Sequence, residues 1–282
     1  MGVGAKHESA AMTVQVSQVH SRDNNVIKLL RRLSEHNTAH RKQGRFWIEG
    51  DHMCRAALDR GLVPTMAVYA QSFWSGAQAP WPDAAARVVV VPDALFGEIS
   101  QLESAAPMGF LIDLPAVDAP RVGVASVILD RVQDAGNVGS ILRSASAFGF
   151  EQVLSLKGSA ALWSPKVLRA GMGAHFGLHL VEGLELQGLH ALGVPLVATS
   201  SHQGELVQFQ MLPWPCAWAF GHEGQGLDAS LTAQAALLCR IGQPGGEESL
   251  NVAAAAAICL HQSAVLRATA SGPQESGDLV RA

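Results

Sequence analysis

Polar side chains that could perform chemistry gather in three turns of the C-terminal half. The first turn follows an apolar run and contains Asn137, Gly139 and Arg143. Asn137 is well placed to cap a helix, and a glycine one turn before an arginine lets a backbone or a ligand approach closely. A guanidinium beside the free N–H groups of a helix start suits a phosphate or a developing oxyanion. The same pattern also describes an ordinary capped helix with a surface arginine.

The second turn runs from Gly221 to Leu227, directly after an apolar run, and contains three glycines. Its backbone can wrap a ligand, but it lacks both the Gly-Lys-Ser/Thr of a Walker loop and the GxGxxG register of dinucleotide folds. Glu223 in such a turn is as readily a cap or a solvated acid. His222 by itself is interpreted as structural.

The third turn runs from Ile241 to Asn251 and leads into an alanine-rich segment. Ser249 and Asn251 both favour the geometry of a helix N-cap. This neutral pair, together with the free N–H groups of a helix start, could hold a carboxylate. The simpler interpretation is a tight turn before a well-capped core helix.

Alternating strand and helix signals position these three turns. Expected strands cover 124–130, 152–156, 195–199, 216–220 and 237–241, and expected helices cover 138–148 and 251–264. Such alternation predicts an α/β domain with a mainly parallel sheet. Ligands of such sheets bind at the carboxyl ends of the strands, where all three turns lie.

The front of the chain predicts a second, smaller α/β domain. Helices are expected over 25–33 and from Met53 to Leu58, strands over 46–49, 66–69 and 88–91, and a loop over 75–83. Composition predicts the following division: a disordered N-terminus at 1–12, a front domain at 13–114, a linker at 115–120, a catalytic domain at 121–270 and a disordered tail at 271–282.

Charge is distributed unevenly along the chain. The formal net charge is -4, yet residues 20–60 carry nine Lys or Arg against five Asp or Glu, and residues 61–120 carry one Arg against six acids. Phosphate binding depends on a local basic surface rather than on the total, so the front domain is a candidate for RNA binding. Solvated helix faces would give the same pattern.

The composition describes a well-cored globular protein, with 48% hydrophobic and 16% charged residues. No apolar run of the length that a membrane helix needs is apparent, and the first residues do not form a secretory signal. The four cysteines lie far apart without a CxxC pair, so we expect single buried thiols rather than a zinc site. A reducing cytoplasm fits these features best.

Together, the three turns resemble the motifs of the SpoU/TrmH family of RNA 2′-O-ribose methyltransferases, within the SPOUT superfamily. They match Asn-x-Gly-x-x-x-Arg, Gly-x-Glu-Gly-x-Gly-Leu and Ser-Leu-Asn-Val-x-x-Ala in order and spacing. The likeness covers Val124 to about Ala270. Further forward, 44–50 resembles the family's substrate-binding domain, and 169–174 resembles another family stretch in which Gly171 replaces a serine.

The resemblance implies a trefoil-knot α/β fold and S-adenosyl-L-methionine as cofactor. It implies cofactor contacts at Thr199, Gly221, Ile241 and Leu250, and catalytic positions at Arg143, Asn137, Glu223, Ser249 and Asn251. Arg143 matches the arginine thought to activate the ribose hydroxyl. Because a guanidinium has a pKa above ~12, we expect Arg143 to stabilise the developing alkoxide and to anchor phosphate rather than to act as a base. No metal is required.

The resemblance also implies a homodimer and an RNA substrate, with neither DNA nor a membrane as partner. A separate front domain favours rRNA, above all 23S rRNA, over tRNA. Phe46 and Trp47 could stack on bases, although a half-buried strand explains them better. Two rivals remain. A dinucleotide-dependent oxidoreductase predicts a GxGxxG turn that is absent, and a non-catalytic RNA-binding protein predicts damaged motifs, whereas Arg143, Glu223 and Asn251 are present.

Overall fold

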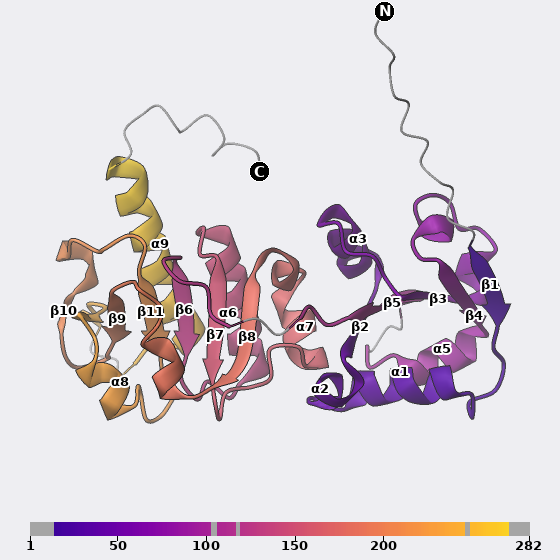
Figure 1. Cartoon of the computed structure of the whole chain (residues 1–282), viewed down its shortest axis with the longest axis horizontal. Coiled ribbons are helices and arrows are strands. Elements are labelled where there is room, and N and C mark those ends of the chain that lie inside the picture. The colour runs from indigo at the N-terminus through magenta and orange to yellow at the C-terminus, as the bar shows by residue number, and fades with distance from the viewer. Residues whose placement is uncertain (1–13, 103–105, 117–118, 246–248, 271–282) are drawn as a thin grey trace, which may run out of the picture. The chain divides into compact units, whose positions relative to one another are not determined.

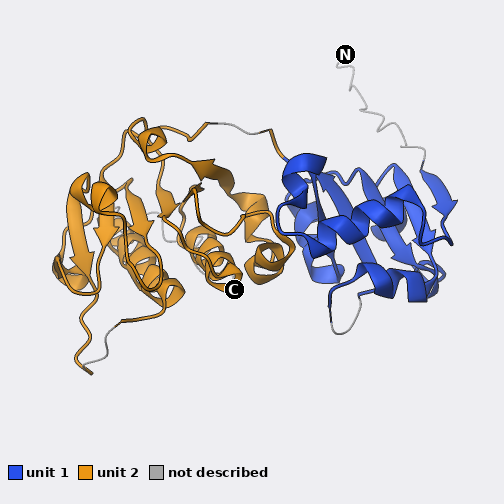
Figure 2. Cartoon of the chain, turned by 90° about the horizontal axis from the view of Figure 1, so that it is seen from below, with its two compact units in different colours: residues 1–114 blue, residues 115–282 orange. Residues whose placement is uncertain are grey.

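The computed structural model describes residues 14–102, 106–116, 119–245 and 249–270. The chain divides into two compact units, Met1–Leu114 and Pro115–Ala282, which Figure 2 shows in blue and orange. The segments 1–12 and 271–282, for which disorder was expected, lie outside the described residues, as do positions 117 and 118 of the expected linker.

The first unit is a five-stranded sheet with helices packed on it. Its strands lie in the order β1-β4-β3-β5-β2, with β5 antiparallel to both β2 and β3 and the other pairs parallel. They are β1 Gln15–Gln18, β2 Arg45–Glu49, β3 Met66–Ala70, β4 Arg87–Val91 and β5 Met108–Asp113. The helices are α1 Asn25–Glu35, α2 Ala39–Gln43, α3 Asp51–Asp59, α4 Gln71–Trp74 and α5 Asp93–Ile99, with a 3-10 turn at Trp81–Asp83.

The helix α1 shows why this unit forms a core. Ile27, Leu30 and Leu33 recur at helical spacing, are buried, and belong to one apolar cluster with side chains of the sheet. The predicted helix at 25–33 and the predicted strands at 66–69 and 88–91 are confirmed.

Trp47 is fixed on the sheet by the absence of a side chain at Gly109. A Cβ built on Gly109 would lie 2.3 Å from Cζ2 of Trp47, so only glycine leaves room for the indole. Phe46 and Trp47 are 1% and 4% exposed. The hypothesis that they stack on RNA bases is therefore wrong, and the interpretation of 46–49 as a strand is confirmed.

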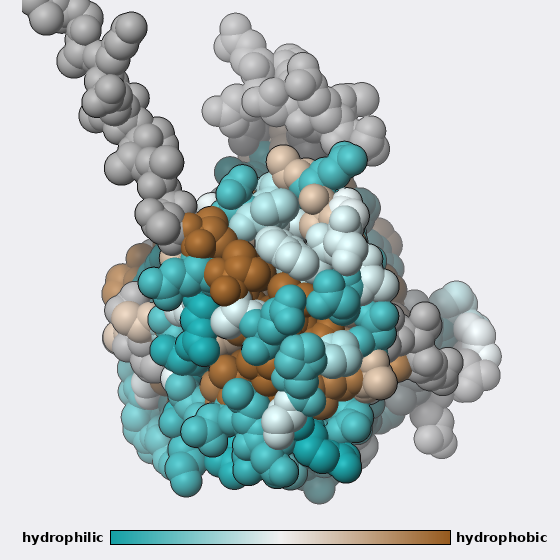
Figure 3. Space-filling model, turned by 90° about the vertical axis from the view of Figure 1, so that its right-hand side faces the viewer, coloured by the Kyte–Doolittle hydropathy of each residue, from teal (hydrophilic) through white to brown (hydrophobic). Residues whose placement is uncertain are grey.

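The strand β1 forms one edge of this sheet, and all four of its residues are exposed. The face of the first unit seen in Figure 3 is largely hydrophilic, with apolar surface between the polar residues.

The second unit contains a seven-stranded sheet in which all neighbouring strands are parallel. The strand order is β10-β12-β9-β11-β6-β7-β8 (Figure 1). The strands are β6 Ser126–Leu129, β7 Gln152–Leu156, β8 His179–Leu184, β9 Leu196–Thr199, β10 Glu205–Leu206, β11 Ala217–Phe220 and β12 Leu237–Arg240. The predicted parallel α/β architecture is confirmed.

Helices and short 3-10 turns complete this unit. The helices are α6 Ala135–Ala147, α7 Pro165–Gly171, α8 Ala229–Ala233 and α9 Val252–Ala270, and the 3-10 turns are Ala174–Gly177, Leu186–Leu189 and Val207–Phe209. Because β6, β11, β9 and β12 are neighbours, their carboxyl ends bring together segments that are distant in the sequence.

The start of α6 differs from the sequence prediction. The N-cap is Asp134, whose side chain accepts the N–H of Asn137 at 2.7 Å, so the prediction that Asn137 caps this helix is wrong. An aspartate three residues earlier satisfies the helix start and leaves the side chain of Asn137 available for other partners. The predicted close approach at Gly139 is confirmed, since a Cβ there would lie 2.3 Å from the Cβ of Ala170 in α7.

The helix α9 is 19 residues long and reaches a mean hydropathy of 1.3, so by length and composition it could span a membrane. This differs from the expectation that no segment is long and apolar enough. In the structure α9 packs against α6 and β11, and Ser263 accepts a hydrogen bond from the indole of Trp218 at 2.8 Å. We therefore interpret α9 as a packing helix of the second unit.

All four cysteines are buried and free, as expected for single buried thiols. Burial raises the pKa of Cys216 to about 12 and that of Cys239 to about 11, so both are thiols at neutral pH. Among the described residues, no cluster of His, Cys, Asp and Glu could hold a metal ion.

His175 is a buried histidine whose place depends on Gly171. A Cβ on Gly171 would lie 2.4 Å from the imidazole, so glycine at this position makes room for the ring. Nε2 donates to the carbonyl of Leu162 at 2.9 Å. Burial lowers the pKa of His175 to about 4, against the opposing effect of that hydrogen bond, so the ring is neutral in the folded protein at neutral pH.

We expect His175 to make the second unit sensitive to acid. An unfolded histidine takes up a proton below pH ~6.5, whereas folded His175 does so only near pH 4. Its contribution is therefore complete above pH ~6.5 and is lost as the pH falls toward 4, which lowers the free energy of unfolding by about 3 kcal/mol over that range. Denaturant unfolding of wild type and His175→Met at several pH values measures this difference.

The matched control is the exposed His190, replaced by Gln, which should follow the wild-type pH dependence. If His175→Met lost stability between pH 6.5 and 4 as steeply as the wild type, the acid sensitivity would have another origin.

Candidate active site

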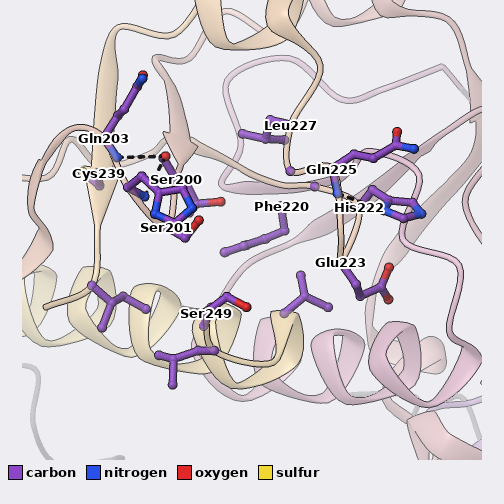
Figure 4. Close-up of a pocket in the computed structure, with 18 of the residues that line it drawn as sticks. Ser200, Ser201, Gln203, Phe220, His222, Glu223, Gln225, Leu227, Cys239 and Ser249 are labelled. Carbon is purple, nitrogen blue, oxygen red and sulfur yellow. Dashed lines mark hydrogen bonds between the residues drawn. The ribbon is translucent and has the colours of Figure 1, made fainter. Parts of the chain in front are cut away.

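A cavity of about 770 Å³ opens at the carboxyl edge of the seven-stranded sheet (Figure 4). Its wall is formed by the segments that follow β9, β11 and β12 and by the start of α9. The lining includes polar side chains, such as Ser200 and Gln203, and apolar ones, such as Leu238 and Ile241. The sheet rule applied to the sequence therefore located the cavity correctly.

The structure brings seven of the nine predicted site residues to this cavity. They are Thr199, Gly221, Glu223, Ile241, Ser249, Leu250 and Asn251. Asn137 and Arg143 are not part of the wall. Of the two candidate caps before α9, Asn251 performs the role, because its Oδ1 accepts the N–H groups of Ala253 and Ala254 at 2.9 and 3.2 Å.

A chain of side-chain hydrogen bonds joins the three turns. Nδ2 of Asn251 donates to Oδ1 of Asn137 at 2.9 Å, and Nδ2 of Asn137 donates to Oε1 of Glu223 at 3.1 Å. These partners are 114 and 86 residues apart in the sequence. Asn137 is therefore the central member of the chain, although it lies outside the cavity wall.

The direction of this chain is fixed at both ends. An ionised Glu223 can only accept hydrogen bonds, so Asn137 must turn its NH₂ toward it and its carbonyl oxygen toward Asn251. At the other end, the N–H groups at the start of α9 require the carbonyl oxygen of Asn251. Each amide thus has a single orientation that satisfies both of its neighbours.

Glu223 is suited to this accepting role. Partial burial would raise its pKa, but hydrogen bonds from Asn137 and from the backbone of Glu223, Asp134 and Gln133 outweigh that effect and lower it. Glu223 is therefore a carboxylate at neutral pH and acts as a fixed acceptor rather than as a proton donor.

The turn after β11 is folded tightly on itself. A Cβ on Gly221 would lie 2.3 Å from the carbonyl carbon of Gly226, so no other residue fits there. His222 and Gly226 exchange two backbone hydrogen bonds, and Nδ1 of His222 accepts the N–H groups of Gly224 and Gln225 at 3.0 and 3.2 Å. The interpretation of His222 as structural is consistent with these bonds.

Sequence analysis missed the segment 200–203, which follows β9 and lines the cavity. The hydroxyl of Ser200 accepts the N–H groups of His202 and Gln203 at 3.2 and 3.1 Å, which closes a tight turn. The available signal was a serine pair directly after a predicted strand, since serine hydroxyls favour such turns. Thr199 donates its hydroxyl to the carbonyl of Ala219 at 2.8 Å, so it ties β9 to β11 at the cavity.

Arg143 stands apart from the other candidates. It is exposed on α6, one turn after Gly139, and forms no hydrogen bond or ion pair with any residue that the structure describes. Its guanidinium is therefore available to a ligand from solution.

Asn251 tests the hydrogen-bond chain apart from helix capping. Asn251→Asp keeps an oxygen that caps α9, so we expect the melting temperature to change by only a few degrees. The carboxylate can no longer donate to Asn137 and repels its carbonyl oxygen. The affinity of the protein for S-adenosyl-L-methionine, the cofactor expected from the sequence, should therefore fall on the order of tenfold or more, as measured by calorimetry.

Asn251→Ser is the matched comparison, because it also caps a helix and is too short to reach Asn137. Equal affinity of the wild type and both variants for the cofactor would show that the hydrogen-bond chain does not shape the cavity.

Comparison with known proteins finds matches to both units of the chain. Residues 125–261 match the model of the SpoU rRNA Methylase family, and residues 24–108 match the MRM3-like substrate binding domain. A putative RNA methyltransferase of the TrmH family from Porphyromonas gingivalis is 32% identical, covering 84% of this chain and 96% of its own, with a TM-score of 0.73.

Two further relatives extend over most of the chain. An AdoMet-bound rRNA methyltransferase from Sinorhizobium meliloti is 26% identical, covering 88% of this chain and 97% of its own, with a TM-score of 0.76. The 23S rRNA (guanosine(2553)-2'-O)-methyltransferase RlmP of Bacillus subtilis (strain 168) is 28% identical over 87% of this chain and 98% of its own length.

Proposed function

Because the chain belongs to the SpoU/TrmH family of RNA methyltransferases, we propose that it transfers a methyl group from S-adenosylmethionine to a ribose 2′-hydroxyl of ribosomal RNA. The observation that carries this proposal is the cavity at the carboxyl edge of the parallel sheet. Two of the turns that line it, those of Glu223 and Asn251, are joined by hydrogen bonds through Asn137. Relatives named as rRNA 2′-O-methyltransferases and an AdoMet-bound relative support the reaction and the cofactor.

The cavity fits an amphipathic nucleoside cofactor. Its volume lies within the range of small-molecule sites. Leu238, Ile241 and Leu250 offer apolar surface to an adenine ring, and the backbone at Gly221 and Ser200, which line the cavity, offers hydrogen-bonding groups. Thr199, Gly221, Ile241 and Leu250 are the residues that we assign to cofactor binding. When bound, S-adenosylmethionine would supply the methyl group: the bond from its sulfur to the methyl carbon would break as the carbon bonds to the ribose oxygen, and the hydroxyl proton would pass to solvent.

The side chains of this protein orient the reactants. Asn137, Glu223 and Asn251 fix the relative positions of the three turns, and Ser249 lies beside Asn251 at the cavity. Arg143 is exposed and unpaired by any described residue, so it is free to bind a phosphate and to stabilise negative charge on the ribose oxygen. Placement of the hydroxyl in line with the transferred group provides much of the acceleration.

The first unit is the RNA-recognition domain in this proposal. Its α1 and α2 present exposed cations, and Arg32 and Lys42 form no ion pair with the residues that the structure describes. Other cations of the basic segment are neutralised, such as Arg22 and Arg31 by Glu98. The match to a substrate binding domain and the names of the relatives favour rRNA over tRNA as the substrate.

Three finer features complete the proposal: a homodimer, a trefoil knot in the second unit and a cytoplasmic location. Ile258 and Val265, one heptad apart on α9, are exposed, and Phe209 and Met211 are 77% and 90% exposed. Exposed apolar side chains of this size support burial by a second copy. Four free cysteines support a reducing compartment.

The proposal is tested by transfer of labelled methyl from S-adenosylmethionine to unmodified rRNA and tRNA pools, with nuclease mapping of the product. We expect a 2′-O-methylated nucleotide in 23S rRNA. Label in tRNA alone would overturn the substrate assignment. Cofactor binding without transfer to naked or ribosome-assembled RNA would favour a non-catalytic RNA-binding protein.

Arg143 can be tested in the same assay. Because Arg143 lies outside the cavity wall, Arg143→Ala should leave the dissociation constant of S-adenosylmethionine within about twofold of wild type. Its kcat should fall on the order of a hundredfold or more, as expected when a charged group that stabilises the transition state is removed.

Arg143→Lys keeps the positive charge but loses the planar fork, and should recover only part of the rate. Turnover of Arg143→Ala at the wild-type rate would remove Arg143 from the mechanism.

A further inference from the structure

The glycine-rich turn 221–228 must keep one shape to form the cavity, yet its sequence gives it great freedom. Gly221, Gly224 and Gly226 restrict the backbone less than any other residues would, and 223–226 are exposed. The carboxylate of Glu223 must nevertheless meet Asn137, and Gln225 and Gly226 line the cavity. The hydrogen bonds between His222 and Gly226 close the turn on itself, but bonds from outside the turn are needed to fix where the closed turn lies relative to the sheet.

Those bonds come from Arg131, which follows β6. Its Nη1 donates to Oε1 of Gln225 at 3.1 Å, and its Nη2 lies 3.4 Å from the carbonyl oxygen of Gly226. These contacts cross 94 and 95 residues of sequence. Arg131 is not among the residues that line the cavity, so it contacts the turn on the side that faces away from the cavity.

The guanidinium of Arg131 is itself fixed by Asp130. Nε and Nη2 each donate to one carboxylate oxygen of Asp130 at 2.9 Å, a fork-to-fork pairing that sets the plane of the guanidinium. Asp130 is 3% exposed, so its charge requires such a partner. Its Oδ2 also accepts the N–H of Asp228 at 2.7 Å, which fixes the far end of the same turn.

The backbone of Arg131 is adapted to this role. Its φ of 58° lies in the left-handed region, which a residue with a side chain adopts only where its surroundings impose it. In this conformation the guanidinium of Arg131 pairs with the carboxylate of Asp130, the preceding residue, and both side chains bind the turn 221–228.

We propose that Arg131, together with Asp130, is a positioning element that holds the turn 221–228 in its cofactor-binding shape. The inference rests on the proposed function, because the cavity is taken as the S-adenosylmethionine site. Arg131 acts through Gln225 and Gly226 rather than by contact with the reactants. If the turn is already ordered before binding, the cofactor does not have to offset the entropy cost of ordering it. Loss of the contacts of Arg131 should therefore lower the affinity for the cofactor.

The test measures binding of S-adenosylmethionine by calorimetry and steady-state kinetics for Arg131→Lys and Gln225→Ala. Arg131→Lys keeps the charge near Asp130 but cannot reach the carboxylate and the turn together. We expect its dissociation constant and its KM for S-adenosylmethionine to rise on the order of tenfold, while the KM for RNA stays near wild type. Gln225→Ala removes the contact with Arg131 at the turn and should weaken binding in the same direction. Because Gln225 also lines the cavity, its own loss of affinity is separated from that of Arg131 by the double-mutant cycle.

A double-mutant cycle decides whether the two residues act together. If they do, Arg131→Lys should weaken binding much less in the Gln225→Ala background than in wild type. Gln234→Ala, an exposed glutamine of the same unit outside the cavity, is the matched control and should bind as wild type does.

The outcomes separate this inference from the proposed function. Absence of S-adenosylmethionine binding to the wild type would overturn the proposed cofactor. Tight binding by the wild type with equal affinity in Arg131→Lys and Gln225→Ala would overturn the positioning role. Additive effects in the cycle would also overturn it, since the two residues would then act separately. If Arg131→Lys failed to fold, wild-type affinity in Gln225→Ala would still overturn the positioning role, because that exposed side chain can be replaced without loss of the fold.

Discussion

The hydrogen bonds of Asn137 are the constraint on which the site depends. A parallel sheet brings the ends of β6, β9, β11 and β12 to one edge, but it does not fix how the following turns face one another. Asn137 does so, because its amide has one donor side and one acceptor side, and each finds a partner from a different turn. The strength of each bond is modest, and the specificity lies in the fixed direction of all of them.

The elements around the site serve this constraint. Asp134 caps α6, which frees the side chain of Asn137. The absence of a side chain at Gly139 lets α7 approach α6 at Ala170, and the absence of one at Gly221 lets the second turn close on itself. Glycines thus lie where two backbone segments pack closely, and polar side chains lie where two turns are joined by hydrogen bonds.

The sequence predicted most of the strands and helices that have strong apolar patterns, and hence the parallel sheet and the edge on which the cavity lies. It did not predict β5, although that strand is apolar and buried. It missed β10, a strand of two residues, and β8, whose residues are mostly half-buried and therefore show no clear pattern. It misplaced the cap of α6 because Asp134 and Asn137 are both good caps, and only the start of the helix distinguishes them. The contacts of Arg131 could not be predicted, because they depend on a left-handed backbone and on partners more than 90 residues away.

The order of these segments along the chain has a consequence for biosynthesis. Asn137 emerges from the ribosome long before Glu223 and Asn251, with which it is bonded in the finished protein. The strands β6 and β7 can pair early, but β11 must later take its place on the other side of β6, and the start of α9 comes last. Such non-local pairing is slow. A nascent chain that ends before Ala217 holds an open edge of β6, and one that ends before Asn251 holds an incomplete cavity. The binding site thus forms only after Asn251 has been synthesised, and until β11 is available the unpaired edge of β6 is open to pairing with another chain.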